Sequence, residues 1–329
     1  MARSVAIIGA GQIGYGAWYC LGDTGHEARI LARSKPAWLS NFEHHFERYE
    51  AGGDSAPEAE VVLDTIPFDA EDIECYDPDR IGHLIVVSSA SVYCDHEGRT
   101  LDEAAQNGFP EFDGPITEEQ STICPGPETY STRKRRMELR ALELFGDRAT
   151  ILRPCAIYGS HSRHPREWWF VKRLLDERKR IPLAFEGQSQ FQTTNADLIG
   201  DFVVEVAERG LAGVFNLADA TSPNVIEIGQ AIARTLDIPV ELVPFSGPPE
   251  RNVGRTPWAV ARPFTVDGSK AARAGQLARI TYGVEAEEAV RWLVDNPPID
   301  WGTAFPQLAA YPWDLFDYEA EDRFFDERL

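Results

Sequence analysis

Residues 5–14 of the chain read Val-Ala-Ile-Ile-Gly-Ala-Gly-Gln-Ile-Gly. The apolar run at residues 5–8 is typical of a short buried strand. Glycines follow it at once, and residues 15–21 then have the apolar content of a buried helix. This stretch therefore predicts a strand, a tight turn and a helix.

The turn carries three glycines, Gly9, Gly11 and Gly14, in the spacing GxGxxG. Between a strand and a helix, the first glycine permits the tight turn and the second lets backbone approach a pyrophosphate. The third allows the helix to pack closely on the sheet. The helix N-terminus presents free N–H groups to the same anion. We therefore expect Gln12 and Ile13 to lie with the glycines against a dinucleotide.

The remaining sequence repeats this alternation of strands and helices. Further strands are expected at residues 28–32, 60–64, 84–88, 150–152 and 214–217, and helices at residues 130–145, 168–180, 196–209 and 223–236, the last capped by Ser222. Strands separated by helices imply parallel pairing with right-handed crossovers. The expected fold class is α/β, with a Rossmann-type doubly wound parallel sheet and a smaller mixed α/β C-terminal lobe.

Two domains are expected. Residues 1–158 would form the dinucleotide-binding domain, and further elements of the same sheet would return around residues 190–220. Residues 159–329 would form mainly a substrate-binding lobe and a tail. Residues 95–127 are rich in glycine, proline and acids, which predicts a long surface loop. The acidic, aromatic residues 313–329 are expected to pack against the body.

Composition excludes several classes of protein. The 329 residues carry a formal net charge of −21, which opposes nucleic acid and anionic membrane surfaces. We find no apolar run of membrane-spanning length. Five cysteines without CxxC spacing indicate neither a disulfide framework nor a metal site. We therefore expect a cytoplasmic protein with a small-molecule substrate and no metal, nucleic-acid or membrane partner.

The residues after the second strand select the nucleotide. A carboxylate there would hold a ribose 2′-hydroxyl, but this chain has Arg33, Ser34 and Lys35. Two cations and a hydroxyl suit a 2′-phosphate, because a guanidinium makes charge-assisted bonds to it. NADP(H) is therefore favoured over NAD(H). The alternative is that Arg33 and Lys35 merely face water.

Three residues form the candidate catalytic set. Tyr130 and Lys134 lie four apart at the start of a helix, so their side chains share a face. A phenol has an ordinary pKa of about 10, and a neighbouring ammonium favours its ionised form. Ser89 follows a strand and would bond the reacting oxygen, while Lys134 would also hold the nicotinamide ribose. YxxxK spacing is common by chance, and serines at strand ends often only cap N–H groups.

Further motifs occur in a fixed order. They are Val-Ser-Ser-Ala-Ser-Val-Tyr at 87–93, Thr-Glu-Glu at 117–119, Leu-Arg-Pro at 152–154 with Tyr-Gly at 158–159, and Asp-Gly-Ser-Lys at 267–270. Together with the glycine turn, they resemble the extended short-chain dehydrogenase/reductase superfamily, named for NAD-dependent epimerases and dehydratases. The resemblance implies that Ser89, Tyr130 and Lys134 are a catalytic triad. It also implies that Pro154 borders the nicotinamide.

Departures from that family pattern bear on the substrate. Many extended members carry an earlier glycine where this chain has Ile8. Ala90 and Ser91 stand where sugar-nucleotide dehydratases resemble one another in an Asp-Glu pair, which disfavours dehydration. Gln190, seven residues before Asp197, stands where epimerases often carry an arginine for the substrate diphosphate. The residues expected to meet substrate are Ser91, His161, Arg163 and Gln190.

Three functions remain open at this point. The leading hypothesis is an NADP(H)-dependent carbonyl reductase or alcohol dehydrogenase acting on a small hydroxylated metabolite. The alternative is a redox-neutral epimerase of sugars or nucleotide sugars with bound NAD(P), and a homodimer is what the resemblance implies. A remote alternative is a non-catalytic RNA-binding relative, for which residues 133–136 offer a basic spot that the overall charge opposes.

Overall fold

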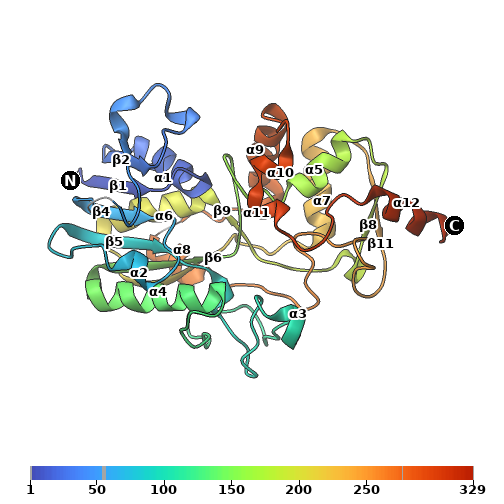
Figure 1. Ribbon diagram of the computed structural model, residues 1–329, viewed down its shortest axis with the longest axis horizontal. Coiled ribbons are helices and arrows are strands. Elements are labelled where there is room, and N and C mark those ends of the chain that lie inside the picture. Colours follow the sequence, from blue (N-terminus) through green and yellow to red (C-terminus); the bar gives the residue numbers. More distant parts are fainter. Residues whose placement is uncertain (1, 54–56, 276, 329) are drawn as a thin grey trace.

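The computed structural model describes residues 2–53, 57–275 and 277–328 of the chain. A seven-stranded parallel sheet forms one side of the molecule (Figure 1), in the order β10-β6-β5-β4-β1-β2-β3. Its strands are β1 (Ser4–Ile8), β2 (Glu27–Ala32), β3 (Phe46–Arg48), β4 (Ala59–Asp64), β5 (Ile81–Val87), β6 (Ala149–Pro154) and β10 (Gly213–Leu217). The strand order reverses between β1 and β4, where ligands of such sheets bind.

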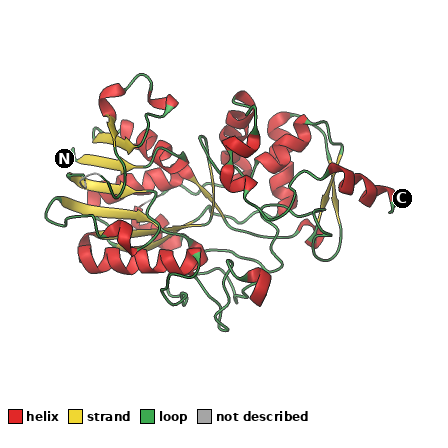
Figure 2. Ribbon diagram, in the orientation of Figure 1, coloured by secondary structure: helices red, strands yellow, loops and turns green. Residues whose placement is uncertain are grey.

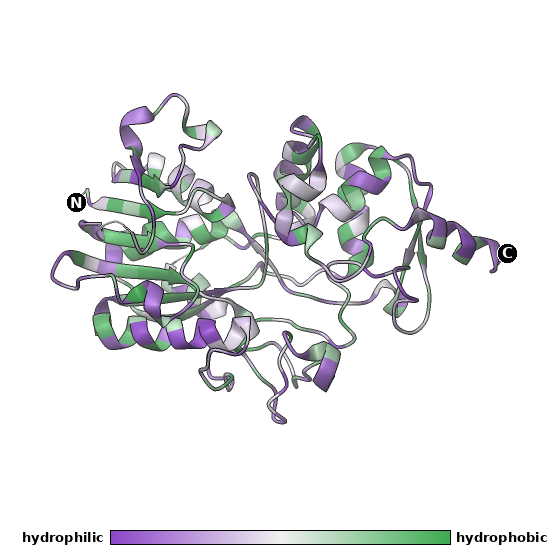
Figure 3. Ribbon diagram, in the orientation of Figure 1, coloured by the Kyte–Doolittle hydropathy of each residue, from purple (hydrophilic) through white to green (hydrophobic). Residues whose placement is uncertain are grey.

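Helices cover both faces of this sheet. Val5 and Ile7 of β1 pack with α1 (Gln12–Gly22) and α6 (Ala196–Arg209). Ala6 and Ile8 point to the opposite face and pack with α4 (Tyr130–Phe145) and the short α2 (Ala70–Ile73). Burial on both faces explains why the strands read as continuous apolar runs, visible in green in Figure 3. The predicted α/β fold is confirmed.

The C-terminal lobe is smaller and mainly helical (Figure 2). Two short parallel pairs run through it, β7 (Ala156–Tyr158) with β9 (Thr193–Asn195), and β8 (Arg180–Leu183) with β11 (Glu241–Pro244). Its helices are α5 (Trp168–Leu175), α7 (Val225–Leu236), α9 (Tyr282–Asp295), α10 (Trp301–Ala304), α11 (Pro306–Ala309) and α12 (Tyr318–Asp326). Trp169, Phe170 and Trp258 are buried in its core.

The chain passes between the two parts more than once. After residue 158, α6 and β10 return to the seven-stranded sheet. The later α8 (Ser269–Gly275) also returns, because its Ala271 joins the same apolar cluster as Phe202 of α6. The sequence did not indicate this second return. The division into domains at residue 158 remains a prediction.

Two predicted helices differ from those observed. α5 ends at Leu175 rather than at residue 180, because Glu177 adopts a φ of 59° and β8 begins at Arg180. α7 is capped by Asn224 rather than by Ser222. The Asn224 side chain accepts a bond from the Glu227 N–H at 2.9 Å, and the Glu227 carboxylate accepts one from the Asn224 N–H at 2.8 Å. This reciprocal pair satisfies two N–H groups at once.

The predicted surface loop at 95–127 is organised by one carboxylate. Asp95 is 3% exposed and accepts bonds from the N–H groups of Glu97, Arg99 and Glu111. Burial alone would raise the pKa of Asp95, but these bonds and the Arg99 guanidinium lower it to about 2. The helix in this loop is the single-turn α3 (Ala104–Asn107). A short 3-10 turn at Ala90–Val92, next to Ser89, lies just before the loop.

The predicted docking of the tail is observed for its described residues, 313–328. Glu321 of α12 is 1% exposed and pairs with the buried Arg173 of α5 at 2.6 Å. Arg173 also donates to the Leu315 carbonyl at 2.7 Å. Leu329 lies outside the described residues. Among the residues that are described, no helix has the length and apolar character needed to cross a membrane.

Candidate functional site

In the glycine turn, Gly9 and Gly14 are tightly packed, whereas Gly11 is open. Gly9 has a φ of 104°, and a Cβ there would lie 2.2 Å from the Thr65 Oγ1. A Cβ on Gly14 would lie 2.0 Å from the Gly9 carbonyl oxygen. A Cβ on Gly11, by contrast, would meet no atom of the described residues within 4 Å. The first and third glycines are therefore required by the fold, and the second leaves backbone accessible to a ligand.

The start of α1 suits an anion. Gly11 is its N-cap and provides no side-chain hydrogen bond, so the first N–H groups lack that partner. Ile13 is buried under the turn, and the Gln12 Oε1 is buried without a hydrogen-bond partner among the described residues. Free N–H groups and the positive end of the helix dipole fit the pyrophosphate of a dinucleotide.

The residues after β2 are exposed, as their predicted role requires. Lys35 pairs with Glu43 at 2.5 Å. Arg33 has no hydrogen-bond or ion-pair partner among the residues that the structure describes, and Ser34 is exposed beside it. Of the two cations, only Arg33 is thus free to meet an added phosphate.

Tyr130 begins α4 because Thr129 caps it. The Thr129 side chain accepts a bond from the Thr132 N–H at 3.2 Å, and the Thr132 hydroxyl accepts one from the Thr129 N–H at 2.9 Å. The next residue, Ser131, donates its N–H to the Asp102 carboxylate at 2.7 Å. The first turn of α4 is thereby fixed at the carboxyl edge of the sheet.

The structure brings Ser89 and Tyr130 together. Ser89 follows β5, and its side chain accepts the Ser91 N–H at 3.1 Å. Tyr130 is 42% exposed. Loss of hydration and the negative charge of Asp102 raise its pKa to about 12, although the nearby Ser89 hydroxyl and the charge of Arg166 lower it. The phenol is therefore protonated at neutral pH.

Lys134 completes the group from one helical turn further along α4. It is 6% exposed, and its Nζ donates to the carbonyls of Pro67 at 2.6 Å and Val87 at 2.8 Å. The Nζ lies 5.7 Å from the centre of the Tyr130 ring. Burial lowers the pKa of Lys134 to about 8, against the opposing effect of the Asp64 carboxylate. The ammonium therefore lies beside the Tyr130 ring.

A positioning residue that sequence reasoning missed lies beneath this group. Glu138 is fully buried, and its carboxylate accepts from the Ser88 hydroxyl at 2.6 Å and from the Arg153 guanidinium at 2.6 and 2.8 Å. It therefore ties the ends of β5 and β6 to α4. One signal could have found it, because Glu138 shares a helical face with Tyr130 and Lys134.

The four residues expected to meet substrate do not gather at one point. Ser91 lies with the catalytic set, and its Oγ accepts a bond from the Ser131 hydroxyl at 2.8 Å. His161 packs between Tyr15 of α1 and Trp292 of α9, with ring centres 4.3 and 5.1 Å away. Arg163 is exposed, and Gln190 donates to the Ser222 carbonyl at 3.1 Å. Pro154, expected beside the nicotinamide, is the buried last residue of β6.

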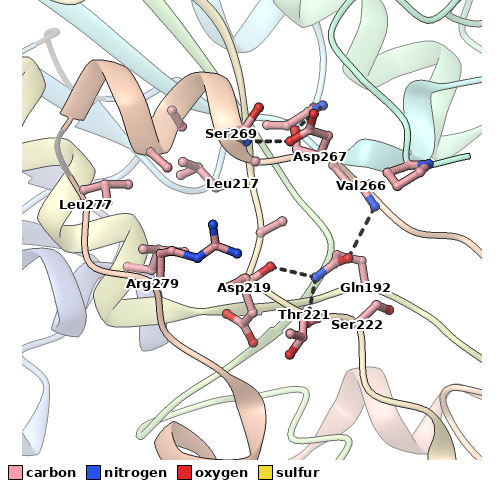
Figure 4. Close-up of a pocket in the computed structure, with 18 of the residues that line it drawn as sticks. Gln192, Leu217, Asp219, Thr221, Ser222, Val266, Asp267, Ser269, Leu277 and Arg279 are labelled. Atoms are coloured by element: carbon pink, nitrogen blue, oxygen red, sulfur yellow. Dashed lines mark hydrogen bonds between the residues drawn. The ribbon is translucent and has the colours of Figure 1, made fainter.

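A separate pocket of about 720 Å³ lies at the carboxyl end of β10 (Figure 4). The Gln192 side chain spans its wall, accepting from the Val266 N–H and donating to the Asp219 carbonyl. Gln190 also lines this pocket, whereas Ser89, Tyr130 and Lys134 do not. Gln190 therefore borders this pocket and not the group formed by Ser89, Tyr130 and Lys134.

Comparison with known proteins shows the fold of the chain. No family model and no curated protein matches the chain. The UDP-glucuronic acid 4-epimerase from Bacillus cereus in complex with NAD superposes with a TM-score of 0.68 at 15% identity, covering 90% of this chain and 100% of that one. The dTDP-glucose 4,6-dehydratase from Bacillus anthracis in complex with NAD gives 0.63 at 17% identity, covering 90% and 97%.

A third structure, the UDP-N-acetylglucosamine 4-epimerase from Methanobrevibacter ruminantium in complex with UDP-N-acetylmuramic acid, gives a TM-score of 0.68 at 14% identity over 90% of this chain and 99% of that one. The chain thus has the fold of the NAD-dependent epimerases and dehydratases along nearly its whole length. The predicted resemblance to the extended short-chain dehydrogenases is confirmed at the level of the fold.

Proposed function

We propose that the chain is an NAD(P)-dependent enzyme that moves a hydride between a nicotinamide and a carbon bearing a hydroxyl or carbonyl oxygen. The observation that carries the proposal is the grouping of Ser89, Tyr130 and Lys134 at the carboxyl edge of the sheet. The open backbone at Gly11 and the free start of α1 fit the dinucleotide. When bound, the nicotinamide accepts or supplies the hydride.

The side chains supply the proton. In reduction, the Tyr130 hydroxyl gives its proton to the carbonyl oxygen, and in oxidation the phenolate takes the proton of the hydroxyl. Ser89, which follows β5 and lies near the phenol, also orients the reacting oxygen. Lys134 stabilises the phenolate left after transfer, because its ammonium lies on the same helical face.

Redox-neutral epimerisation of a sugar or nucleotide sugar, with retained NAD(P), is the first candidate reaction. It is supported by the similarity in fold to NAD-bound sugar epimerases. Elimination of water is disfavoured, because Ala90 and Ser91 supply neither a carboxylate acid nor a carboxylate base. A homodimer and a cytoplasmic location remain predictions from the resemblance and the composition.

Net NADP(H)-dependent reduction of a small hydroxylated metabolite is the second candidate. It is favoured by Arg33, whose unpaired guanidinium follows β2 where a 2′-phosphate would lie. The two candidates differ in cofactor consumption. Conversion of one UDP-sugar epimer to the other without loss of NADPH supports the first, and stoichiometric NADPH oxidation supports the second.

The proposal is tested by Tyr130→Phe. Removing one proton donor while keeping the ring should lower turnover by about 10²- to 10⁴-fold, with the melting temperature and cofactor binding retained. Tyr19→Phe, at a tyrosine that is 65% exposed on α1, is the matched control and should be fully active. Turnover of Tyr130→Phe at the wild-type rate would refute the assigned chemistry.

A further inference from the structure

Arg166 is a half-buried cation that lacks a counter-ion. It lies in the loop between β7 and α5, and among the described residues no carboxylate pairs with it. Its Nε is buried without a hydrogen-bond acceptor. The chain has 53 acidic and 32 basic residues, so the lack of a counter-ion for Arg166 does not reflect a shortage of acids. Holding a guanidinium away from water without a partner costs free energy.

The neighbours of Arg166 keep it in place without neutralising it. Its Cζ lies 5.7 Å from the centre of the Phe191 ring. The adjacent Glu167 is buried and accepts the Tyr282 hydroxyl at 3.1 Å instead. Burial raises the pKa of Glu167 to about 7, against the opposing charge of Arg166 and the hydrogen bond from Tyr282, and no ion pair forms between Glu167 and Arg166. The guanidinium edge therefore remains available for a bidentate contact with an oxyanion.

Arg166 also acts on the group that would move the proton. Phe191, whose ring lies beside the guanidinium, packs in the apolar cluster that contains Ala90, the residue after Ser89. The charge of Arg166 also lowers the pKa of Tyr130. It lowers the pKa of Cys155 too, which directly follows β6 at the edge of the sheet. Lys134 approaches Tyr130 from the sheet side, where two carbonyls already occupy its Nζ. Of these two cations, only Arg166 has no hydrogen-bond or ion-pair partner among the residues that the structure describes.

We propose that Arg166 binds an anionic group of the substrate, a carboxylate or a phosphate, near the carbon served by Tyr130. The site therefore selects acidic substrates over neutral ones of the same size. This inference rests on the proposed function only in taking Tyr130 as the place of reaction. It names a substrate class that the fold alone does not specify.

The test measures anion binding by calorimetry on the full chain, with NAD and with NADP in separate series. The probes are malonate, inorganic phosphate and the neutral malonamide. Wild-type protein should bind at least one of the two anions and discriminate against malonamide. Arg166→Gln should lose about ten- to a hundred-fold in affinity for that anion, the range for a charge-assisted hydrogen bond. The anion that binds more tightly, malonate or phosphate, shows whether the site prefers a carboxylate or a phosphate.

Two further variants keep the test decisive. Arg166→Lys retains the charge without the planar fork and should lose less affinity than Arg166→Gln. Arg323→Gln, at an exposed arginine of α12 that pairs with Glu319, should bind the anions as the wild type does. Equal anion affinity in wild type and Arg166→Gln would overturn the inference, as would equal affinity of wild type for malonate and malonamide.

The outcome is independent of turnover. Tyr130→Phe should bind malonate or phosphate as tightly as the wild type, because the phenol is not the anion's ligand. If Tyr130→Phe proves fully active while Arg166→Gln loses anion binding, the proposed function fails and the anion site stands. If Tyr130→Phe is inactive and Arg166→Gln binds anions normally, the proposed function stands and the anion site fails.

Discussion

At the scale of single residues, two buried charged groups beside the candidate site are held in different ways. Glu138 is held by Ser88 and Arg153, whereas Lys134 has only carbonyl oxygens as hydrogen-bond partners. The first arrangement fixes geometry, because a buried carboxylate with all its bonds made is costly to move. The second leaves a charge that is poorly solvated and therefore responsive to pH.

Lys134 should make stability depend on pH in the alkaline range. Its pKa is about 8 in the folded protein and about 10.4 in an unfolded chain. Between these values the unfolded chain binds the proton and the folded protein does not, so stability rises with pH. The unfolding free energy of wild type minus that of Lys134→Met should therefore increase from pH 8 to pH 10, measured by urea titration. A flat difference would show that Lys134 keeps its ordinary pKa.

Arg33 should set the choice of nucleotide. Arg33→Ala removes the guanidinium that would meet a 2′-phosphate, and should lower the ratio of NADPH to NADH affinity by about tenfold or more. Lys35→Ala is the matched comparison, since Lys35 already pairs with Glu43 and should matter less. Fluorescence titration of both cofactors gives the ratio. An unchanged preference in Arg33→Ala would mean that this side chain only faces water.

At the scale of elements, helices α1 and α6 pack closely against each other through glycines on one face of the sheet. A Cβ on Gly200 of α6 would lie 2.6 Å from the Gly16 carbonyl oxygen of α1 and 2.8 Å from the Cys20 sulfur. The two backbones therefore approach too closely for any side chain at this crossing. This contact supports the start of α1, where the dinucleotide would bind.

Gly200→Ala should destabilise the protein by roughly 1–3 kcal/mol, since overpacking forces the helices apart. Gly22→Ala is the control, because a Cβ at the end of α1 meets no described atom within 4 Å. Alanine is the better helix former, so that variant should be neutral or slightly more stable. Chemical denaturation of both gives the comparison, and equal stabilities would argue against a tight crossing.

Elements with strong local signals could be predicted from the sequence. Residues 130–145 and 196–209 form helices with those same bounds, because each follows a capping residue, Thr129 or Asn195. The predicted helix at 168–180 extended too far, since a positive φ at Glu177 ends it early. Asn224, and not the predicted Ser222, caps α7, because Asn224 forms a reciprocal pair of hydrogen bonds with Glu227.

Residues whose roles depend on distant partners could not be predicted in the same way. The triad spacing was visible because Tyr130 and Lys134 share one helix. Glu138 needs Arg153 from β6, and Arg166 needs Phe191 beside it and Tyr130 within electrostatic reach. Such contacts are set by the tertiary fold. The sequence indicates only the helical face that Glu138 shares with Tyr130 and Lys134, and the basic character of the loop that holds Arg166.

At the scale of the whole molecule, the tail is held by a buried ion pair that also anchors the C-terminal lobe. Glu321→Gln should destabilise the protein by about 3–5 kcal/mol, because it leaves the buried Arg173 without a counter-ion. Asp322→Asn, which alters the exposed side of the pair with Arg178, should cost about 1 kcal/mol or less. Thermal unfolding checks both, and similar losses would contradict a special role for the buried pair.

The return of α6, β10 and α8 to the sheet has a consequence for how the protein is made. When the ribosome has released residue 158, the sheet still lacks the edge strand β10 and the helices α6 and α8 on its α1 face. The free edge of β6 therefore stays unpaired, and its apolar surface uncovered, while part of the other lobe is synthesised. Synthesis and folding are therefore coupled across both lobes, and a gene fragment ending at residue 158 would yield an incomplete, aggregation-prone sheet.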